Sequence, residues 1–575
     1  MRIKDIIPYA LGKKPAHVLF KNARIVNVFT GEIEEANIAV FRKRIAGVGD
    51  YTEGERVIDL KGMYVVPGLI DAHLHIESSM LSPRQFAKAV LLHGTTTVIA
   101  DPHEIANVLG LDGIRYMIEA TEGIPLNVYI AVPSAVPASP GFETSGSRIG
   151  AEDVVYFAER YPKRIIALGE VMNFPGVLNL DYETITKIEV LRHKYKKIDG
   201  HAPGLTGKEL NAYISAFIRS DHESTRPEEA LEKVSRGMQV FIREGTTAKD
   251  LDALIKVVNE RNHFFFSFCT DDKDALDILE EGHIDHNIRK AIAHGIDPII
   301  AIRMATINTA RYFNLRSMGA VAPGYKADFV VLDDLESFRI RMVVKDARIV
   351  VEDGKFVGEL KGKIADVPEV VGHVKLPKFT SNDLKVKDRG KKIRVIRIFE
   401  KSLITDELIV EPKVESGYVV SDVERDILKI AVFDRHTGSG FSIGFVSGFG
   451  LKRGALSASI GHDSHNVFSI GVSDEDIEFA AKEVQRMNGG IVLVDGKKVV
   501  EAIPLPVAGL MSNEPLEKVA SRIRNLEEKL VEYGTNREKM MGIFFVQLSV
   551  IPKIKITDKG IVDVNARKFV DLFVD

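Results

Sequence analysis

Two histidines separated by one residue, His73 and His75, follow an apolar run at residues 65–70. The run is rich in β-branched residues and predicts a buried strand. Alternate residues of a strand face the same side, so both imidazoles point the same way and can bind one cation. In parallel α/β proteins the carboxyl ends of the strands carry the reaction site. The pair therefore predicts a metal site at the end of a strand.

Further side chains of the metal-ligand type follow apolar runs later in the chain. They are Asp101, His103, Glu104, Glu170, His201, His222 and Asp271. Their nitrogen and oxygen donors suit Zn2+, Mn2+ or Fe2+. We expect His73, His75 and Asp271 to hold one ion and His201 and His222 to hold a second, with Glu170 as the bridge. The alternative is one ion on His73, His75, a later histidine and Asp271, which leaves Glu170 as a proton carrier.

A water molecule between two divalent ions loses a proton near neutrality and becomes a nucleophile, which is the chemistry of metal-dependent hydrolases. Asp271 would accept that proton and pass it to the leaving group, because a carboxylate at the end of a strand lies within hydrogen-bonding reach. The residues thus predict a hydrolytic enzyme.

Residues 67–318 are the part of the chain that must position these groups. They alternate apolar strands with amphipathic helices, which is the pattern of a (β/α)8 barrel, and a length of about 250 residues fits one such barrel. After the opening strand, the expected strands are residues 96–100, 127–131, 165–169, 197–200, 216–219, 239–243 and 263–268. A helical segment at 297–313 would close the barrel. The ligand-type residues then gather at the carboxyl ends of the strands.

Short β-rich runs flank this block on both sides and predict one small β-sandwich that is built from residues 1–66 and 319–364. Residues 365–390 are rich in Lys, Pro, Asp and Val and are expected to form a linker. Residues 391–575 then form a C-terminal α/β domain. The predicted fold class is α/β.

Composition excludes several kinds of partner. The 77 basic and 81 acidic residues give a net charge of -4 and are well mixed, so neither a nucleic acid nor an anionic membrane surface is expected as a partner. The single cysteine excludes an intramolecular disulfide and fits a reducing compartment. The sequence offers no membrane span and no signal-peptide pattern, so we expect a cytoplasmic protein.

Several motifs give the chain a resemblance to a known superfamily. The segments 67–75, 304–306 and 319–328, together with His201, His222 and Asp271, resemble the amidohydrolase superfamily over about residues 17–355. Within it, the segments 75–80, 101–108, 169–173, 200–203 and 269–272 resemble the bacterial and archaeal adenine deaminase family. Segments 461–466 and 489–491 are similar to the extra C-terminal domain of that family, so the resemblance covers nearly the whole chain.

The resemblance implies hydrolysis of adenine to hypoxanthine and ammonia in purine salvage, at a pair of Mn2+ or Fe2+ ions, with Zn2+ also compatible. A metal-held hydroxide would attack C6 of adenine, and Asp271 would deliver protons with help from a second acid, Glu77 or Glu104. Asp101 and His103 are the candidates for contacts with the substrate. Where many superfamily members bridge the ions with a carbamylated lysine, this sequence offers Glu170. A homo-oligomer is expected from the resemblance alone.

Two other functions remain open. The same scaffold could hydrolyse cyclic amides or dipeptides, because fold and metal do not fix the substrate. A non-catalytic assembly protein is disfavoured, since every expected ligand is present. The pair His462 and His465 allows three readings: a reach into the barrel mouth or a neighbouring subunit, a separate metal site, or a hydrogen-bonded turn.

Overall fold

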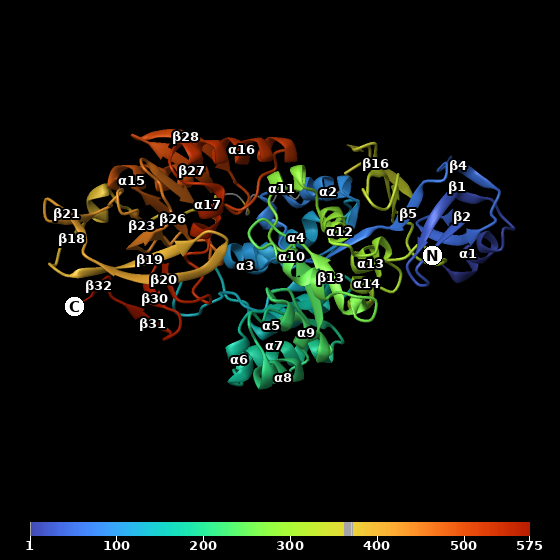
Figure 1. Ribbon diagram of the computed structural model, residues 1–575, viewed down its shortest axis with the longest axis horizontal. Coiled ribbons are helices and arrows are strands. Elements are labelled where there is room, and N and C mark those ends of the chain that lie inside the picture. The colour runs from blue at the N-terminus through green and yellow to red at the C-terminus, as the bar shows by residue number, and fades with distance from the viewer. Residues whose placement is uncertain (1, 361–369, 371, 575) are drawn as a thin grey trace.

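The computed structural model describes residues 2–360, 370 and 372–574. Along its longest axis, a β-sheet formed near the N-terminus, a central block of parallel strands and a C-terminal body follow one another (Figure 1). The two ends of the chain lie at opposite ends of this row (Figure 1). The central block thus has a different neighbour on each side. Among the described residues, no helix has the length and apolar character needed to cross a membrane.

The sheet at the N-terminal end combines strands from before and after the central block. Its order is β17-β16-β15-β14-β5-β1-β2-β3, and β4 pairs with β1. The strands are β1 (Ala16–Asn27), β2 (Glu32–Phe41), β3 (Arg44–Gly49), β4 (Gly54–Asp59), β5 (Tyr64–Pro67), β14 (Phe329–Leu332), β15 (Ile340–Lys345), β16 (Arg348–Glu352) and β17 (Lys355–Phe356). Antiparallel pairing of β5 with β14 joins the two segments. The helix α1 (Ile3–Ala10) packs near β2 and β3.

The central block contains eight strands in two hydrogen-bonded groups. One group has the order β10-β9-β8-β7-β6 and the other has the order β11-β12-β13, and all their pairings are parallel. The strands are β6 (Leu69–Leu74), β7 (Thr95–Ala100), β8 (Asn127–Val132), β9 (Ile165–Val171), β10 (Lys197–Gly200), β11 (Ser220–Asp221), β12 (Gln239–Arg243) and β13 (Phe266–Cys269). A parallel bridge between Leu74 and Asp271 links the ends of β6 and β13. This arrangement is compatible with a barrel.

Helices connect and cover these strands. They are α2 (Pro83–Leu92), α3 (His103–Leu109), α4 (Leu111–Ala120), α5 (Ala151–Arg160), α6 (Phe174–Leu178), α7 (Tyr182–His193), α8 (Gly207–Ser215), α9 (Pro227–Ser235), α10 (Leu251–Leu254), α11 (Ala275–Glu280), α12 (Ile284–Ala293), α13 (Pro298–Met304) and α14 (Ile307–Tyr312). The last two occupy the segment that was expected to be helical at 297–313. Asp297 begins α13 by accepting hydrogen bonds from the backbone of Ile299 and Ile300, and Pro298 fits the first helical position.

Three of the expected strands have different bounds in the structure. The opening apolar run is two strands, because Gly68 separates β5 from β6; a Cβ at Gly68 would lie 2.2 Å from Thr96 Oγ1. The strand expected at 216–219 is wrong: α8 extends to Ser215, Phe217 has a positive φ of 67°, and β11 begins only at Ser220. Residues 263–265 form a 3-10 turn rather than the start of β13. Apolar composition alone did not separate these turns from strands.

The C-terminal body is built on a nine-stranded sheet of order β20-β19-β24-β23-β26-β25-β27-β28, with β32 beside β19. These strands are β19 (Lys392–Phe399), β20 (Ser402–Val410), β23 (Ile427–Phe433), β24 (Phe441–Ser447), β25 (Ala455–Ala458), β26 (Val467–Gly471), β27 (Gly490–Asp495), β28 (Lys498–Pro504) and β32 (Phe573–Val574). Smaller sheets comprise β18 (Val386–Lys387), β21 (Lys413–Glu415) and β22 (Tyr418–Val420), and β29 (Ile554–Thr557), β30 (Gly560–Asp563) and β31 (Lys568–Val570). The helices are α15 (Asp474–Arg486), α16 (Leu516–Glu532) and α17 (Arg537–Phe544).

The expected linker at 365–390 lies partly outside the described residues. Of its described part, Ser381–Leu384 forms a 3-10 turn and β18 pairs with β22 of the C-terminal body. The end of this segment is therefore packed in the body that follows it.

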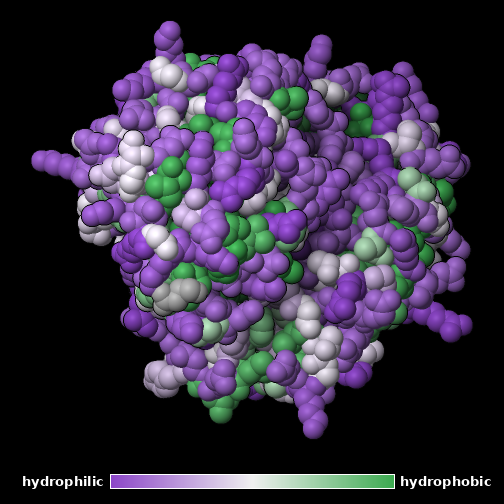
Figure 2. All heavy atoms as spheres, turned by 60° about the vertical axis from the view of Figure 1, so that its left-hand side comes forward, coloured by the Kyte–Doolittle hydropathy of each residue, from purple (hydrophilic) through white to green (hydrophobic). Residues whose placement is uncertain are grey.

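The C-terminal body contacts the central block at the carboxyl ends of its strands. Ser512 accepts a hydrogen bond from the backbone of Ser82 and donates one to Met80, each at 2.8 Å. Arg537 forms ion pairs with Asp274 and Asp277, at 2.5 and 2.9 Å. The face of the molecule in Figure 2 is mainly hydrophilic, with small scattered hydrophobic groups. The contact with the block thus combines backbone hydrogen bonds and buried charges.

Candidate metal centre and active site

His73 and His75 lie at the carboxyl end of β6 with their side chains on the same side, as strand geometry requires. Both are buried, and their Nε2 atoms are 3.3 Å apart. The other ring nitrogen of each histidine has a partner: Nδ1 of His73 is 2.8 Å from Asp199 Oδ2, and Nδ1 of His75 is 2.8 Å from the carbonyl oxygen of Asp101. Those partners leave both Nε2 lone pairs free to face one point.

Four more predicted ligands converge on this point from other strands. Asp271 Oδ1 lies 3.5 Å from His73 Nε2 and 3.2 Å from His75 Nε2. Glu170 also approaches these histidines, with Oε1 3.4 Å from His75 Nε2. Its second oxygen, Oε2, lies 2.5 Å from His201 Nδ1 and 3.3 Å from His222 Nε2. All six predicted ligands are thus brought together.

The donor set fits divalent cations. Two groups of three have ligand atoms close enough to share an ion, namely His73 with His75 and Asp271, and Glu170 with His201 and His222. Glu170 presents one oxygen to each group, which is the arrangement that a bridging carboxylate needs. Nδ1 of His222 is buried and has no hydrogen-bond partner among the described residues. Nitrogen and oxygen donors of this kind suit Zn2+, Mn2+ and Fe2+.

The electrostatics of the centre also favour positive charge. Burial raises the pKa of Glu170, but the neighbouring His201 and further imidazole hydrogen bonds outweigh it and hold that pKa well below its usual range. Asp271 follows the same pattern, with hydrogen bonds from His73 and His75 lowering its pKa against the effect of burial. Two ionised carboxylates in a buried site are stabilised by nearby positive charge, which protonated imidazoles or a bound cation can supply.

The remaining predicted site residues surround this centre. Oδ2 of Asp101 accepts a hydrogen bond from the backbone of Glu170 at 3.0 Å, so this carboxylate holds the end of β9. His103, the first residue of α3, lies between Glu170 and Glu104, with Nδ1 3.4 Å from Glu170 Oε1 and Nε2 3.5 Å from Glu104 Oε1. Asp101 therefore supports a ligand, and His103 faces both carboxylates.

Glu77 is buried beside a cavity at the mouth of the central block. Its Oε1 accepts a hydrogen bond from the backbone of Ile105 at 3.2 Å, whereas Oε2 has no partner among the described residues. Burial raises the pKa of Glu77 to about 7. A carboxyl group with that pKa can both give and accept a proton near neutrality.

Two functional candidates were not predicted from the sequence. Asp199 is fully buried at the end of β10 and orients His73; its place two residues before His201 on a strand was a usable signal. Arg243, the last residue of β12, donates to Asp271 Oδ2 at 3.0 Å and also pairs with Glu223 and Asp250. Its position at a strand end was the only indication in the sequence.

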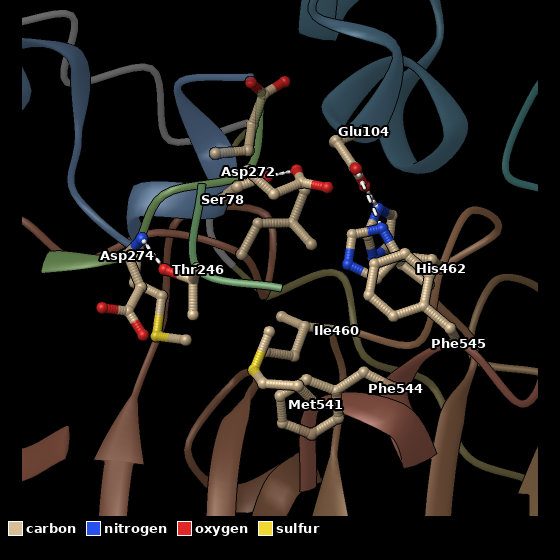
Figure 3. A pocket seen from close by; sticks show the side chains of 14 residues that line it. Ser78, Glu104, Thr246, Asp272, Asp274, Ile460, His462, Met541, Phe544 and Phe545 are labelled. Carbon is tan, nitrogen blue, oxygen red and sulfur yellow. Dashed lines mark hydrogen bonds and ion pairs between the residues drawn. The ribbon is translucent and has the colours of Figure 1, made fainter. Parts of the chain in front are cut away.

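The cavity beside the centre is lined from two parts of the chain. Figure 3 shows Glu104, Ser78 and Asp272 from the central block facing Ile460, His462, Phe544 and Phe545 from the C-terminal body. Asp272 accepts a hydrogen bond from Ser78. Both rings of His462 and His465 contact Glu104, so this pair reaches the mouth of the central block, which agrees with the first reading and is compatible with a metal site there.

Comparison with known proteins agrees with this geometry. The family model described as Amidohydrolase family matches residues 64–357, and the one described as Adenine deaminase C-terminal domain matches residues 402–568. A protein of Thermosipho africanus strain TCF52B named adenine deaminase is 62% identical over the full length of both chains. The chain belongs to the adenine deaminase family. Proteins with the same name from Thermosipho melanesiensis and Kosmotoga olearia are 59% and 58% identical, over 100% of this chain and 100% and 99% of theirs. Members of the amidohydrolase superfamily use a divalent metal.

Proposed function

We propose that this chain hydrolyses adenine to hypoxanthine and ammonia with a pair of divalent cations, Mn2+ or Fe2+, while Zn2+ is compatible with the same donors. The observation that carries the proposal is the convergence of six predicted ligands on one buried point, with Glu170 facing both groups of three. Full-length similarity to proteins named adenine deaminase supports adenine as the substrate. We also propose that the eight parallel strands close into a (β/α)8 barrel, which places this point at the mouth.

The reaction adds water to C6 of adenine and breaks the bond from C6 to its exocyclic nitrogen, which leaves as ammonia. When bound, the cations would lower the pKa of a water molecule so that it becomes a nucleophile. We assign the acceptance of that water's proton to Asp271; the support is that Oδ1 faces the two histidines while Arg243 holds Oδ2. The protein thus supplies a base that is already oriented.

A second proton carrier must serve the leaving nitrogen or the ring. Glu77 fits this role, because it lines the cavity, has an oxygen without a partner, and has a pKa of about 7. Glu104, the other candidate, is in contact with His462 and His465. We therefore assign proton delivery to Glu77 in preference to Glu104.

The test is the formation of ammonia and hypoxanthine by protein that has been stripped of metal and reloaded with Mn2+, Fe2+ or Zn2+. Asp271→Asn should lower turnover at least about 100-fold, the usual contribution of a positioned base. Asp112→Asn, on the exposed face of α4, is the matched control and should leave turnover unchanged. If folded, metal-loaded protein releases no ammonia from adenine but hydrolyses cyclic amides or dipeptides, the alternative function replaces this one.

A further inference from the structure

A second cluster of ligand-type side chains lies beside the centre and joins the two bodies. It consists of Glu104 in the first turn of α3 and of His462 and His465 in the loop between β25 and β26. His462 Nδ1 lies 3.0 Å from Glu104 Oε1, and His465 Nε2 contacts Glu104 Oε2. The side chain of Glu104 points from the central block toward His462 of the C-terminal body (Figure 3). The exposed fractions of the three residues are 2%, 8% and 2%.

One ring nitrogen of this cluster lacks a partner. Nδ1 of His465 is buried and has no hydrogen-bond partner among the described residues, whereas Nε2 of the same ring contacts Glu104 Oε2. A buried polar atom without a partner is unfavourable. One donor atom from each of the three residues lies within 4.8 Å of the others. A cation at their centre would satisfy two nitrogens and a carboxylate oxygen together.

The loop that carries the histidines is held in place by contacts within the protein. The ring of His462 stacks on Phe545 with a centroid distance of 4.1 Å and an angle of 2°. The backbone of His465 donates to Gly461 at 2.7 Å, and Asn466 Nδ2 donates to the carbonyl oxygen of Thr144 at 2.8 Å. A site whose ligands are already oriented loses less entropy on binding.

The cluster is also separate from the proposed metal pair. His103 lies between them, with one ring nitrogen facing Glu170 and the other facing Glu104. None of the six ligands assigned to the pair belongs to the cluster. An ion here would therefore be additional to the pair.

We propose that Glu104, His462 and His465 bind a third divalent cation, which fastens the C-terminal body to the mouth of the central block. Two imidazole nitrogens and one carboxylate oxygen suit Zn2+, Mn2+, Fe2+ or Co2+. All three residues line the cavity, so water can complete the coordination from that side. The proposal does not depend on adenine being the substrate.

The first test counts the metal ions per chain by mass spectrometry after stripping and reloading the full-length protein. The wild type should hold three, and His462→Ala or His465→Ala should hold two. His193→Ala, at the exposed end of α7, is the matched control and should keep three. Circular dichroism checks that each variant is folded. An unchanged metal count in both variants of the cluster would overturn the proposal.

The second test places a spectroscopic reporter in the cluster. His465→Cys loaded with Co2+ should give a near-ultraviolet charge-transfer band from thiolate to cobalt, because thiolate is a metal ligand. The wild type should give none, since its single cysteine, Cys269, is fully buried among apolar side chains. The further substitution His201→Ala, which disrupts the proposed pair, should leave the band in place. Failure of the metal-loaded wild type to turn over adenine, with the band present in His465→Cys, would thus contradict the proposed function only, whereas an absent band would contradict the third site.

Discussion

Replacing Asp199 by asparagine keeps the shape of the side chain and changes one oxygen to an amide group. Oδ1 of Asp199 accepts hydrogen bonds from Ser220 Oγ at 2.5 Å and from the backbone of Gly200 at 3.0 Å. Those two donors require an acceptor, so the carbonyl oxygen of an asparagine would take the place of Oδ1. Its amide group would then face Nδ1 of His73, where Asp199 Oδ2 now lies at 2.8 Å.

An amide N–H can donate to Nδ1 only if that nitrogen carries no proton. The proton of the neutral His73 ring would therefore move to Nε2, and the Nε2 lone pair would no longer be available to a metal. Loss of a carboxylate that orients a ligand histidine costs about 10–100-fold in metal affinity. Because the tautomer also changes, we expect a loss at the upper end of this range, about 100-fold in metal affinity, or about 2.7 kcal/mol.

The dissociation constant for Mn2+ is measured by competition with a chromogenic chelator. Ser220→Ala is the matched control: it removes one donor to Oδ1 but keeps the carboxylate on His73, and its affinity should stay within about threefold of the wild type. If Asp199→Asn binds Mn2+ as tightly as the wild type while remaining folded, His73 is not the ligand that we infer.

Three other substitutions test buried charges of the central block and of the C-terminal body. Lys233→Met should lower the free energy of unfolding in urea by about 3–5 kcal/mol, because it leaves the buried carboxylate of Asp221 without its ammonium partner at 2.8 Å; a loss below 1 kcal/mol would contradict this. Arg243→Gln should lower adenine turnover about 10–100-fold by releasing Asp271 Oδ2. It should also lower the Tm, because Glu223 and Asp250 lose the same guanidinium partner; an unchanged Tm would contradict this. Lys555→Met should raise the Tm most below pH 7. Burial lowers the pKa of this lysine from 10.5 to about 7, so below pH 7 the folded state holds a buried charge, and the cost declines as pH rises toward 10. A Tm difference that is the same at pH 6 and pH 9 would refute that account.

Local sequence signals were sufficient for the ligands of the centre. The period of two along a strand placed His73 and His75 on one side, and the carboxyl ends of β9 and β13 placed Glu170 and Asp271 near them. These positions depend on short-range geometry and on one general property of parallel strands, namely that their carboxyl ends carry the reaction site. A prediction of this kind still holds where the bounds of a strand are wrong. At β11 the predicted bounds differ from the observed ones by a few residues, and His222 still lies just beyond the strand.

The residues that hold the proposed ligands in position could not be assigned in the same way. Asp199 and Arg243 act through single hydrogen bonds to His73 and Asp271, and a buried aspartate or arginine on a strand has no pattern that names its partner. His462 and His465 depend on how a distant body packs, since Glu104 is more than 350 residues away along the chain. Sequence periodicity carries no information about such contacts.

The C-terminal body lines the cavity beside the proposed metal pair. The carboxyl ends of the strands would otherwise face water, which weakens the electrostatic interactions of Glu77 and Asp271 with a reacting group. Phe544 and Phe545 of that body line the cavity from the opposite side with apolar surface, which disfavours water there. Its ion pairs, from Arg537 to Asp274 and Asp277, end on the segment that directly follows Asp271 and Asp272. Movement of the C-terminal body would therefore change both the hydration of the cavity and the position of the proposed base. On this argument the two parts form one active site.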